Sequence, residues 1–197
     1  MANHVTTWMV VNQASPAVYQ RLKEMFKDAT SWESFDSMKF YEILYPEYAG
    51  EDYSREEFTN RMGAKWCYVE EADCQDDSFT MTTISAWSWS HAAFQRLHKI
   101  LNEIDDEDVI MTATYEDEGY NFVGGAAIKN TDDLYDYDDE TLEWPEDAWE
   151  NDEVMDAFYE MAGDSMASCR DEAYDDATWS DDEDEIEDSE EYDELFQ

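Results

Sequence analysis

The amino-acid sequence predicts an α+β protein, in which helices cover one face of an antiparallel sheet and an acidic, mostly helical region follows. Two observations predict the sheet. Strand-like runs alternate with amphipathic helical stretches, and two pairs of these runs are joined by short polar segments typical of hairpins. A third observation marks the extension, because acidic residues become much denser after residue 129. We therefore divide the chain into a domain at 1–129 and a C-terminal region at 130–197.

The first strand and the first helices are predicted before residue 63. The run TTWMVVN (6–12) is strand-like, and SPAVYQRLKEMFK (15–27) follows with Ser15 as N-cap and Pro16 at the first helical position. Apolar residues then recur at helical spacing as far as Phe26. Residues 31–62 are expected to form short helices, the last of which ends at Gly63.

Two hairpins and a helix between them are predicted for residues 64–128. AKWCYVEEA (64–72) and SFTMTTISAW (78–87) form the first hairpin, and DVIMTATYE (108–116) and YNFVGGAAI (120–128) form the second. Between them, SHAAFQRLHKILNEI (90–104) has its apolar residues on one helical face. The adjacent Gly124 and Gly125 interrupt a strand pattern, which indicates a bulge or close packing.

Several short motifs in residues 63–125 occur together in one known family. They are a Gly-x-Lys-Trp strand, a Thr-rich strand ending in Ala-Trp-Ser, a helix, and a Tyr-Glu-Asp-Glu-Gly strand with a later glycine. The residues concerned are Gly63, Lys65, Trp66, Ala86, Trp87, Ser88, Tyr115, Glu116, Glu118, Gly119 and Gly124. The stretch resembles the YubB-type ferredoxin-like domain of plasmid and phage proteins. The resemblance implies a ferredoxin-like fold and a mobile-element origin but no established chemistry, and it does not reach the acidic region.

The net charge restricts the classes of partner. The chain has 53 acidic and 11 basic residues, for a net charge of −42, and residues 130–197 hold 30 of the acids with Arg170 as their single Lys or Arg. Such a charge opposes binding to nucleic acid and to anionic lipid, so partners should be basic. No apolar run approaches the roughly 18 residues of a membrane span, and no secretory signal is recognisable at the N-terminus. We expect a cytoplasmic protein, in the host cell's cytoplasm if a phage encodes it.

The sequence contains no recognisable motif for catalysis or for metal or cofactor binding. The three cysteines form no CxxC pair, and no HExxH, nucleotide-binding or nucleophile-elbow motif occurs. His91 and His98 are seven residues apart and could share a helix face, but no carboxylate lies between them at a ligand position. An EF-hand starting at Asp136 would need glycine where Thr141 stands, and Pro145 interrupts it. We expect no catalytic residue, no metal and no cofactor, and therefore no enzyme.

The segment PEDAWENDEVMDAFYEMAGDSMASC (145–169) has the pattern of an amphipathic helix with one strongly acidic face. The expected apolar stripe consists of Ala148, Met155, Phe158, Tyr159, Ala162 and Met166, with Trp149 at its edge. The opposite face has about one carboxylate per turn, or one every ~5.4 Å. Soluble helices usually mix charge signs, whereas this face has no Lys or Arg. The stripe indicates that the helix docks and holds its carboxylates as a fixed array. A plain solvated face is the alternative.

Aromatic and other apolar residues interrupt the acidic region throughout. They are expected to anchor the acidic chain to the globular part, because burial of their side chains offsets repulsion among the carboxylates. The residues concerned are Tyr135, Tyr137, Leu142, Trp144, Trp149, Tyr174, Trp179, Ile186, Tyr192, Leu195 and Phe196. Residues 180–197 have two interpretations. They either anchor in the same way or form a disordered acidic-hydrophobic segment that folds on binding.

These patterns favour a DNA-mimic inhibitor, whose carboxylates would occupy the DNA-binding groove of a host defence nuclease or another DNA-binding protein, as in anti-restriction or anti-CRISPR function. The expected partner-binding residues are Asp132, Asp133, Asp136, Asp138, Asp139, Glu140, Glu146, Asp147, Glu150, Glu153, Asp156, Glu160, Asp164, Asp181, Asp182, Glu183, Asp184 and Glu185. Direct nucleic-acid binding is not expected. Two alternatives remain, namely an acidic scaffold or chaperone for basic proteins, and a halophilic protein that is acidic only for solubility.

Overall fold

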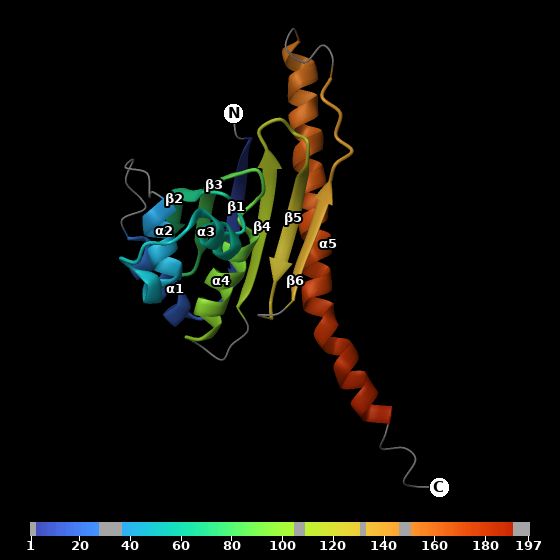
Figure 1. Cartoon of the computed structure of the whole chain (residues 1–197). Helices are drawn as coiled ribbons and strands as arrows, with labels where there is room; N and C mark the ends of the chain where they lie inside the picture. Colours follow the sequence, from blue (N-terminus) through green and yellow to red (C-terminus); the bar gives the residue numbers. More distant parts are fainter. Residues whose placement is uncertain (1–2, 28–36, 105–108, 131–132, 146–150, 191–197) are drawn as a thin grey trace.

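The computed structural model is an α+β fold built on one six-stranded antiparallel sheet (Figure 1). It describes residues 3–27, 37–104, 109–130, 133–145 and 151–190, with side chains as far as residue 179. The elements are β1 (His4–Gln13), α1 (Pro16–Phe26), α2 (Ser37–Leu44), the short 3-10 helix η1 (Pro46–Tyr48), α3 (Arg55–Met62), β2 (Cys67–Cys74), β3 (Phe79–Ala86), α4 (His91–Asn102), β4 (Ile110–Asp117), β5 (Val123–Ile128), β6 (Leu134–Asp139) and α5 (Asp152–Glu190).

The strands lie in the order β2-β3-β1-β4-β5-β6. β1 is central in the first part of the sheet and pairs antiparallel with both β3 and β4. The two predicted hairpins are confirmed as the β2–β3 and β4–β5 pairs. β6 then adds a sixth strand beside β5, although its segment was expected to be an acidic extension and not part of the sheet.

Local signals place the start of α1 and the end of α3 where the sequence predicts them. Pro16 occupies the first turn of α1 after Ser15 in extended backbone. α3 begins with a capping box, in which the Ser54 hydroxyl accepts from the Glu57 backbone N–H and the Glu57 carboxylate accepts from the Ser54 N–H. It ends at Gly63, whose φ of 79° is the left-handed conformation that glycine adopts most easily.

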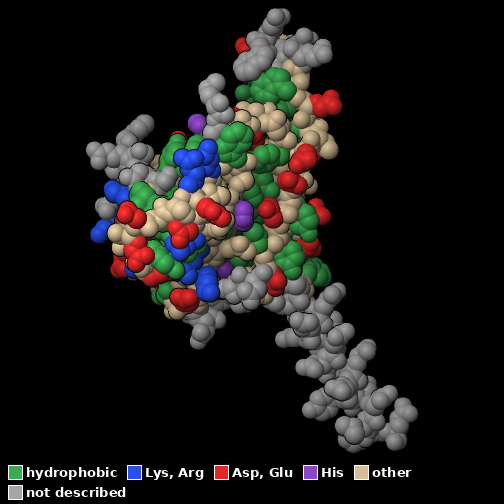
Figure 2. Space-filling model, in the orientation of Figure 1, with side chains coloured by type: hydrophobic (Ala, Val, Ile, Leu, Met, Phe, Trp, Pro, Cys, Tyr) green, Lys and Arg blue, Asp and Glu red, His purple; other side chains and the backbone are tan. Residues whose placement is uncertain are grey.

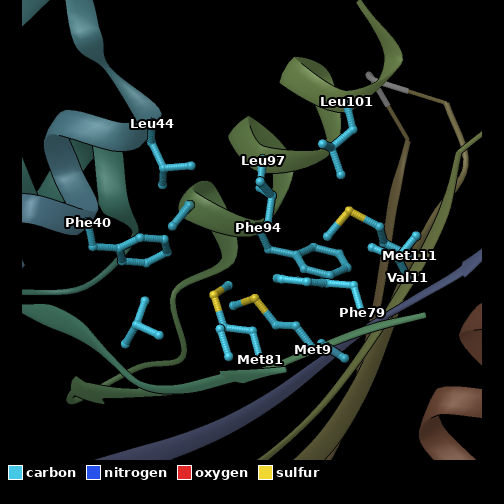
Figure 3. Close-up of a cluster of buried hydrophobic side chains, with 14 of the residues drawn as sticks. Met9, Val11, Phe40, Leu44, Phe79, Met81, Phe94, Leu97, Leu101 and Met111 are labelled. Carbon is cyan, nitrogen blue, oxygen red and sulfur yellow. The ribbon is translucent and has the colours of Figure 1, made fainter. Parts of the chain in front are cut away.

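Helices α1–α4 cover one face of the sheet, and the main hydrophobic core lies between them. Figure 3 shows Met9, Phe79 and Met81 from the strands facing Phe94 and Leu97 of α4, and all five side chains are buried. α5 packs on the other face, over β5, β6 and the adjoining part of β4. Among the described residues, the sheet therefore has a helical layer on one side and one long helix on part of the other.

The two adjacent glycines of β5 allow close packing on both faces of the sheet. A Cβ at Gly124 would lie 2.3 Å from the Tyr115 hydroxyl on the core face, and one at Gly125 would lie 2.2 Å from the backbone nitrogen of Arg170 in α5. Such separations are far below van der Waals contact, so glycine is required at both positions. Close packing, one of the two interpretations of the pair, is therefore the reason for these glycines.

His98 gives the fold a dependence on pH. It is fully buried on α4, with its Nε2 2.7 Å from the carbonyl oxygen of Val109. Burial lowers the pKa of His98 below its ordinary value of 6.5. As the pH falls through about 6.5, His98 becomes protonated in the unfolded chain but stays neutral in the folded chain. The contribution of neutral His98 to the free energy of unfolding is therefore complete above that pH and is lost as the pH falls toward the lower pKa of the folded state.

We expect His98→Gln to reduce the loss of stability on acidification. Between pH 7.5 and 5.5 the free energy of unfolding of the natural protein should fall, relative to the variant, by at most about 1.4 kcal/mol per pH unit. Comparing the two proteins separates His98 from carboxyl groups such as Glu116, whose pKa burial raises and whose effect has the opposite sign. Urea unfolding at several pH values checks this, with His4→Gln, at an exposed histidine, as the control. Parallel curves for the natural protein and His98→Gln would contradict it.

Candidate protein interface on the C-terminal helix

The inner face of α5 carries the stripe that fixes the helix to the sheet. Phe158, Ala162, Ala173 and Ala177 are each at most 2 % exposed, and they follow one another at intervals of four, eleven and four residues, which keeps them on one side of the helix. Ala173 and Ala177 pack with Ala127 of β5 in a small cluster that also includes the tyrosines of β6. Small residues on both sides bring the helix close to the strand, as Gly125 also does. The sequence-based expectation that this helix docks is confirmed.

A cluster of rings anchors the N-terminal part of α5. Phe158 lies with its ring centroid 4.9 Å from that of Trp144 and 5.1 Å from that of Tyr120, in edge-to-face arrangements. Tyr159 packs against Tyr120 at 5.8 Å. Aromatic pairs of this geometry stabilise by about 0.5–1.5 kcal/mol beyond the burial of their surface. Trp144 therefore anchors the acidic region at the loop between β4 and β5, as expected. The same expectation was wrong for Trp179, which is 69 % exposed on α5.

Polar contacts fix one flank of α5 to β6. The Ser165 hydroxyl donates to Asp139 Oδ2 at 2.7 Å, and the Tyr137 hydroxyl donates to Asp176 Oδ2 at 2.5 Å. Hydrogen bonds from Ser165 and from Thr141 lower the pKa of Asp139, whereas the bond to Asp176 raises the pKa of Tyr137 to about 12. At neutral pH Asp139 is therefore ionised when it accepts from Ser165, and Tyr137 keeps the proton that it donates to Asp176.

The outer face of α5 carries an exposed line of carboxylates, which we call the α5 ridge. Its members are Glu153, Asp156, Glu160, Asp164, Asp171 and Asp175, all of them exposed. They follow one another at intervals of three, four or seven residues, so they share one side of the helix over ~33 Å. With Asp152, Glu172 and Asp176, this part of α5 has about one carboxylate per 4 Å of axis, compared with one phosphate per about 3.4 Å on a DNA strand.

Positive charge is almost absent from the α5 ridge. Arg170 is the single Lys or Arg after residue 129, and its guanidinium forms an ion pair with Asp171 at 2.7 Å. In Figure 2, Lys and Arg side chains are seen over the α1–α4 part, where Asp and Glu side chains lie among them, whereas the described charged side chains seen on the β6 and α5 side are Asp and Glu. The field around α5 is therefore strongly negative.

The sequence-predicted site residues are distributed over several places. Glu153, Asp156, Glu160 and Asp164 belong to the α5 ridge, as expected. Asp133 and Glu140 are exposed at the two ends of β6, and Asp138 is exposed on β6. Asp132, Glu146, Asp147 and Glu150 lie outside the described residues, and Asp181, Asp182, Glu183, Asp184 and Glu185 lie where the structure describes only the backbone of α5. The helix begins at Asp152, later than the pattern from residue 145 predicts.

The carboxylate of Asp136 is held by hydrogen bonds within the fold and is not free for a partner. Its Oδ2 accepts from Trp89 Nε1 at 3.0 Å and its Oδ1 accepts from the Tyr115 hydroxyl at 2.7 Å, although part of the residue is exposed. Trp89 and Tyr115 stack with centroids 5.0 Å apart. Burial of the carboxyl group raises the pKa of Asp136, and the two hydrogen bonds oppose that shift only in part. Alternation along β6 places Asp136 on the face of α1–α4, away from the α5 ridge.

Sequence reasoning missed the second half of the ridge. Asp171 and Asp175 continue the acidic line, and the predicted helix stopped short of both. A signal was present in the sequence, because Ala173 and Ala177 keep the apolar stripe in phase with Ala162. Small alanines give a weak hydrophobic pattern, and this is why the stripe was not followed further.

Comparisons with known proteins give no relative. No family of known proteins, no curated protein and no solved structure matches the chain. No helix in the described part of the chain is long and apolar enough to cross a membrane.

Proposed function

We propose that the protein is a DNA-mimic inhibitor that occupies the DNA-binding groove of a basic target protein. The observation that carries the proposal is the α5 ridge, a line of exposed carboxylates on a helix that the sheet holds in place. A ridge of ~33 Å matches about one turn of a DNA duplex. A groove shaped for one turn of phosphate backbone therefore has room for this helix.

The physical basis of inhibition is competition between DNA and this protein for the same Lys and Arg side chains of the target. Lys and Arg side chains that bind phosphates bind carboxylates by the same charge-assisted hydrogen bonds. Because α5 is ordered before it binds, little of the binding free energy is lost to ordering it. The net charge of −42 steers the protein to a basic groove and makes association fast and sensitive to salt.

The topology of the sheet supports an origin of the protein in a plasmid or phage. The element order β-α-β-β-α-β, with strands in the order β2-β3-β1-β4, corresponds to a ferredoxin-like split βαβ arrangement and supports the resemblance to the YubB-type domain. A mobile-element protein that blocks host defence would act in the cytoplasm, on a nuclease of restriction or CRISPR type. No catalytic function is proposed, because the α5 ridge consists of carboxylates, which can bind the Lys and Arg side chains of a partner.

Elution with DNA tests this function. The protein is immobilised, bacterial lysate is passed over it, and retained proteins are eluted either with a short DNA duplex or with polyglutamate of the same total charge. We expect a retained DNA-binding protein to leave with the duplex at a much lower concentration than with polyglutamate. Release by both polyanions at equal concentration would indicate an acidic scaffold and would contradict a DNA mimic.

A further inference from the structure

Within the part of the chain that the structure describes, the face of the sheet that α5 occupies is only half covered. α5 packs on β5, β6 and part of β4. In β1 the residues of the core face, from Val5 to Val11, are at most 3 % exposed, whereas Trp8, on the opposite face, is 36 % exposed. Strand register places Trp8 opposite Thr82 of β3 and Thr114 of β4, so these three side chains share one surface. We call the surface formed by Thr6, Trp8, Val10, Tyr68, Thr80, Thr82 and Thr114 the open half-sheet.

One flank of α5 borders this surface. Ser165 and Asp176 bond to β6, so their flank of the helix faces the outer edge of the sheet. Positions about half a turn away around the helix, Gly163, Ala167 and Tyr174, face the other way, toward β4 and the open half-sheet. A Cβ at Gly163 would meet nothing within 4 Å, so there is free space beside this flank.

We propose that the open half-sheet, together with this flank of α5, receives one basic amphipathic helix of the target protein. The width fits, because strands lie about 4.8 Å apart and a helix with its side chains is about 10–12 Å across. β2, β3 and β1 therefore offer the width of one helix. A helix in this position would lie beside α5 and complete the second layer on the sheet.

Charge decides the chemistry of the occupant. Register places the exposed Glu71 and Asp73 of β2 on the same face as the open half-sheet, opposite Thr82 and Thr80. On the other side, helix geometry places Asp156 on the α5 flank that borders it. An apolar and threonine-rich floor with acidic sides suits a helix that has apolar residues on one face and Lys or Arg on its edges. The same negative field disfavours a nucleic acid.

This inference rests on the proposed function and extends it. The α5 ridge supplies the long-range attraction, and the open half-sheet supplies short-range contact through Trp8. Exposed aromatic residues in the centre of a surface are frequent anchors of protein interfaces, and truncation of such an anchor commonly costs at least tenfold in affinity. A basic helix that normally lies in the DNA groove of the target has the required chemistry.

Two synthetic peptides test the inference. Each is about 20 residues long, enough for a helix of ~30 Å, and contains only leucine and lysine. In one peptide the leucines share a helical face, and in the other the same residues are scrambled. Titration of the intact protein, followed by fluorescence anisotropy of a labelled peptide, is done at low and at physiological salt for the natural protein, Trp8→Ser and Trp179→Ser. Trp179 is an exposed tryptophan on α5 outside the open half-sheet and is the matched control.

We expect the amphipathic peptide to bind the natural protein and Trp179→Ser equally and to bind Trp8→Ser at least about tenfold more weakly. Binding of the scrambled peptide should be weaker, lost at physiological salt, and the same for all three proteins. Equal binding of both peptides, or no effect of Trp8→Ser, would overturn the inference and leave the DNA-mimic function standing. A dimer of the chain that Trp8→Ser dissociates would also overturn it, since the surface would then bind a second copy.

Discussion

Replacing Glu153, Asp156, Glu160 and Asp164 by their amides is expected to weaken binding to the target about a hundredfold. Exposed ion pairs contribute about 0.7 kcal/mol each, within the measured range, and four such losses correspond to a factor of about 100 in affinity. Amides keep the size and polarity of the side chains. All four residues are exposed on the outer face of α5, so the fold and its thermal stability should be unchanged or slightly improved by the lower self-repulsion.

The salt dependence of binding gives the sharper readout for this variant. Fewer ion pairs mean a smaller slope of log affinity against log salt concentration, and the loss should lie mainly in the association rate. A matched control changes the same number of charges elsewhere, with Glu51→Gln, Asp52→Asn, Glu56→Gln and Asp77→Asn, all exposed and outside the C-terminal region. Surface plasmon resonance of the two variants checks the difference. Equal losses in both would mean that net charge acts alone and that the α5 ridge has no special position.

Gly125→Ala is expected to loosen α5 from the sheet. The new Cβ would lie 2.2 Å from the backbone nitrogen of Arg170 and 2.5 Å from its Cα, and backbone atoms cannot move aside without moving the helix. Overpacking of this kind costs about 1–3 kcal/mol. The contacts of Ala173 and Ala177 with Ala127 depend on the same close approach, so they should weaken together.

Hydrogen–deuterium exchange measures the loosening directly. Amides of α5 around residues 158–177 should exchange faster in Gly125→Ala than in the natural protein, whereas amides of β1 and α4 should change little. Target binding should weaken as well, although every carboxylate of the α5 ridge is retained. Gly163→Ala is the control, because it has free space and replaces glycine inside a helix, so it should stabilise by about 0.5–1 kcal/mol. Unchanged exchange along α5 in Gly125→Ala would show that the helix is not held by this contact.

Much of the fold follows from local patterns in the sequence. The hairpins β2–β3 and β4–β5 come from strand-like runs around polar turns, and Gly63 ends α3 as expected. Each of these features needs only residues close in the chain, which is why sequence reasoning finds them.

The strand β6 could not be predicted in the same way. Its sequence, LYDYDD, has three aspartates, a residue that strands usually avoid. Pairing with β5 and the bonds of Tyr137 and Asp139 to α5 compensate for that poor propensity. These contacts join residues 26 to 39 positions apart, so they become visible only in three dimensions.

The candidate site was predicted in part for a similar reason. Spacing alone placed Glu153, Asp156, Glu160 and Asp164 on one face of a helix, because helical geometry is regular. Spacing could not show that Asp136 turns to the opposite face of the sheet and bonds Trp89 and Tyr115. Composition marks a region as acidic, whereas strand register decides which of its carboxylates are free for a partner.

Equilibrium competition tests the central claim most directly, that the α5 ridge and a DNA duplex bind the same groove. A purified partner from the elution experiment is titrated with the protein at several fixed concentrations of duplex, and complexes are separated by native mass spectrometry. We predict that the apparent dissociation constant rises in proportion to the duplex concentration and that no ternary complex forms. A stable complex of target, DNA and this protein, with an apparent dissociation constant independent of DNA, would contradict the account.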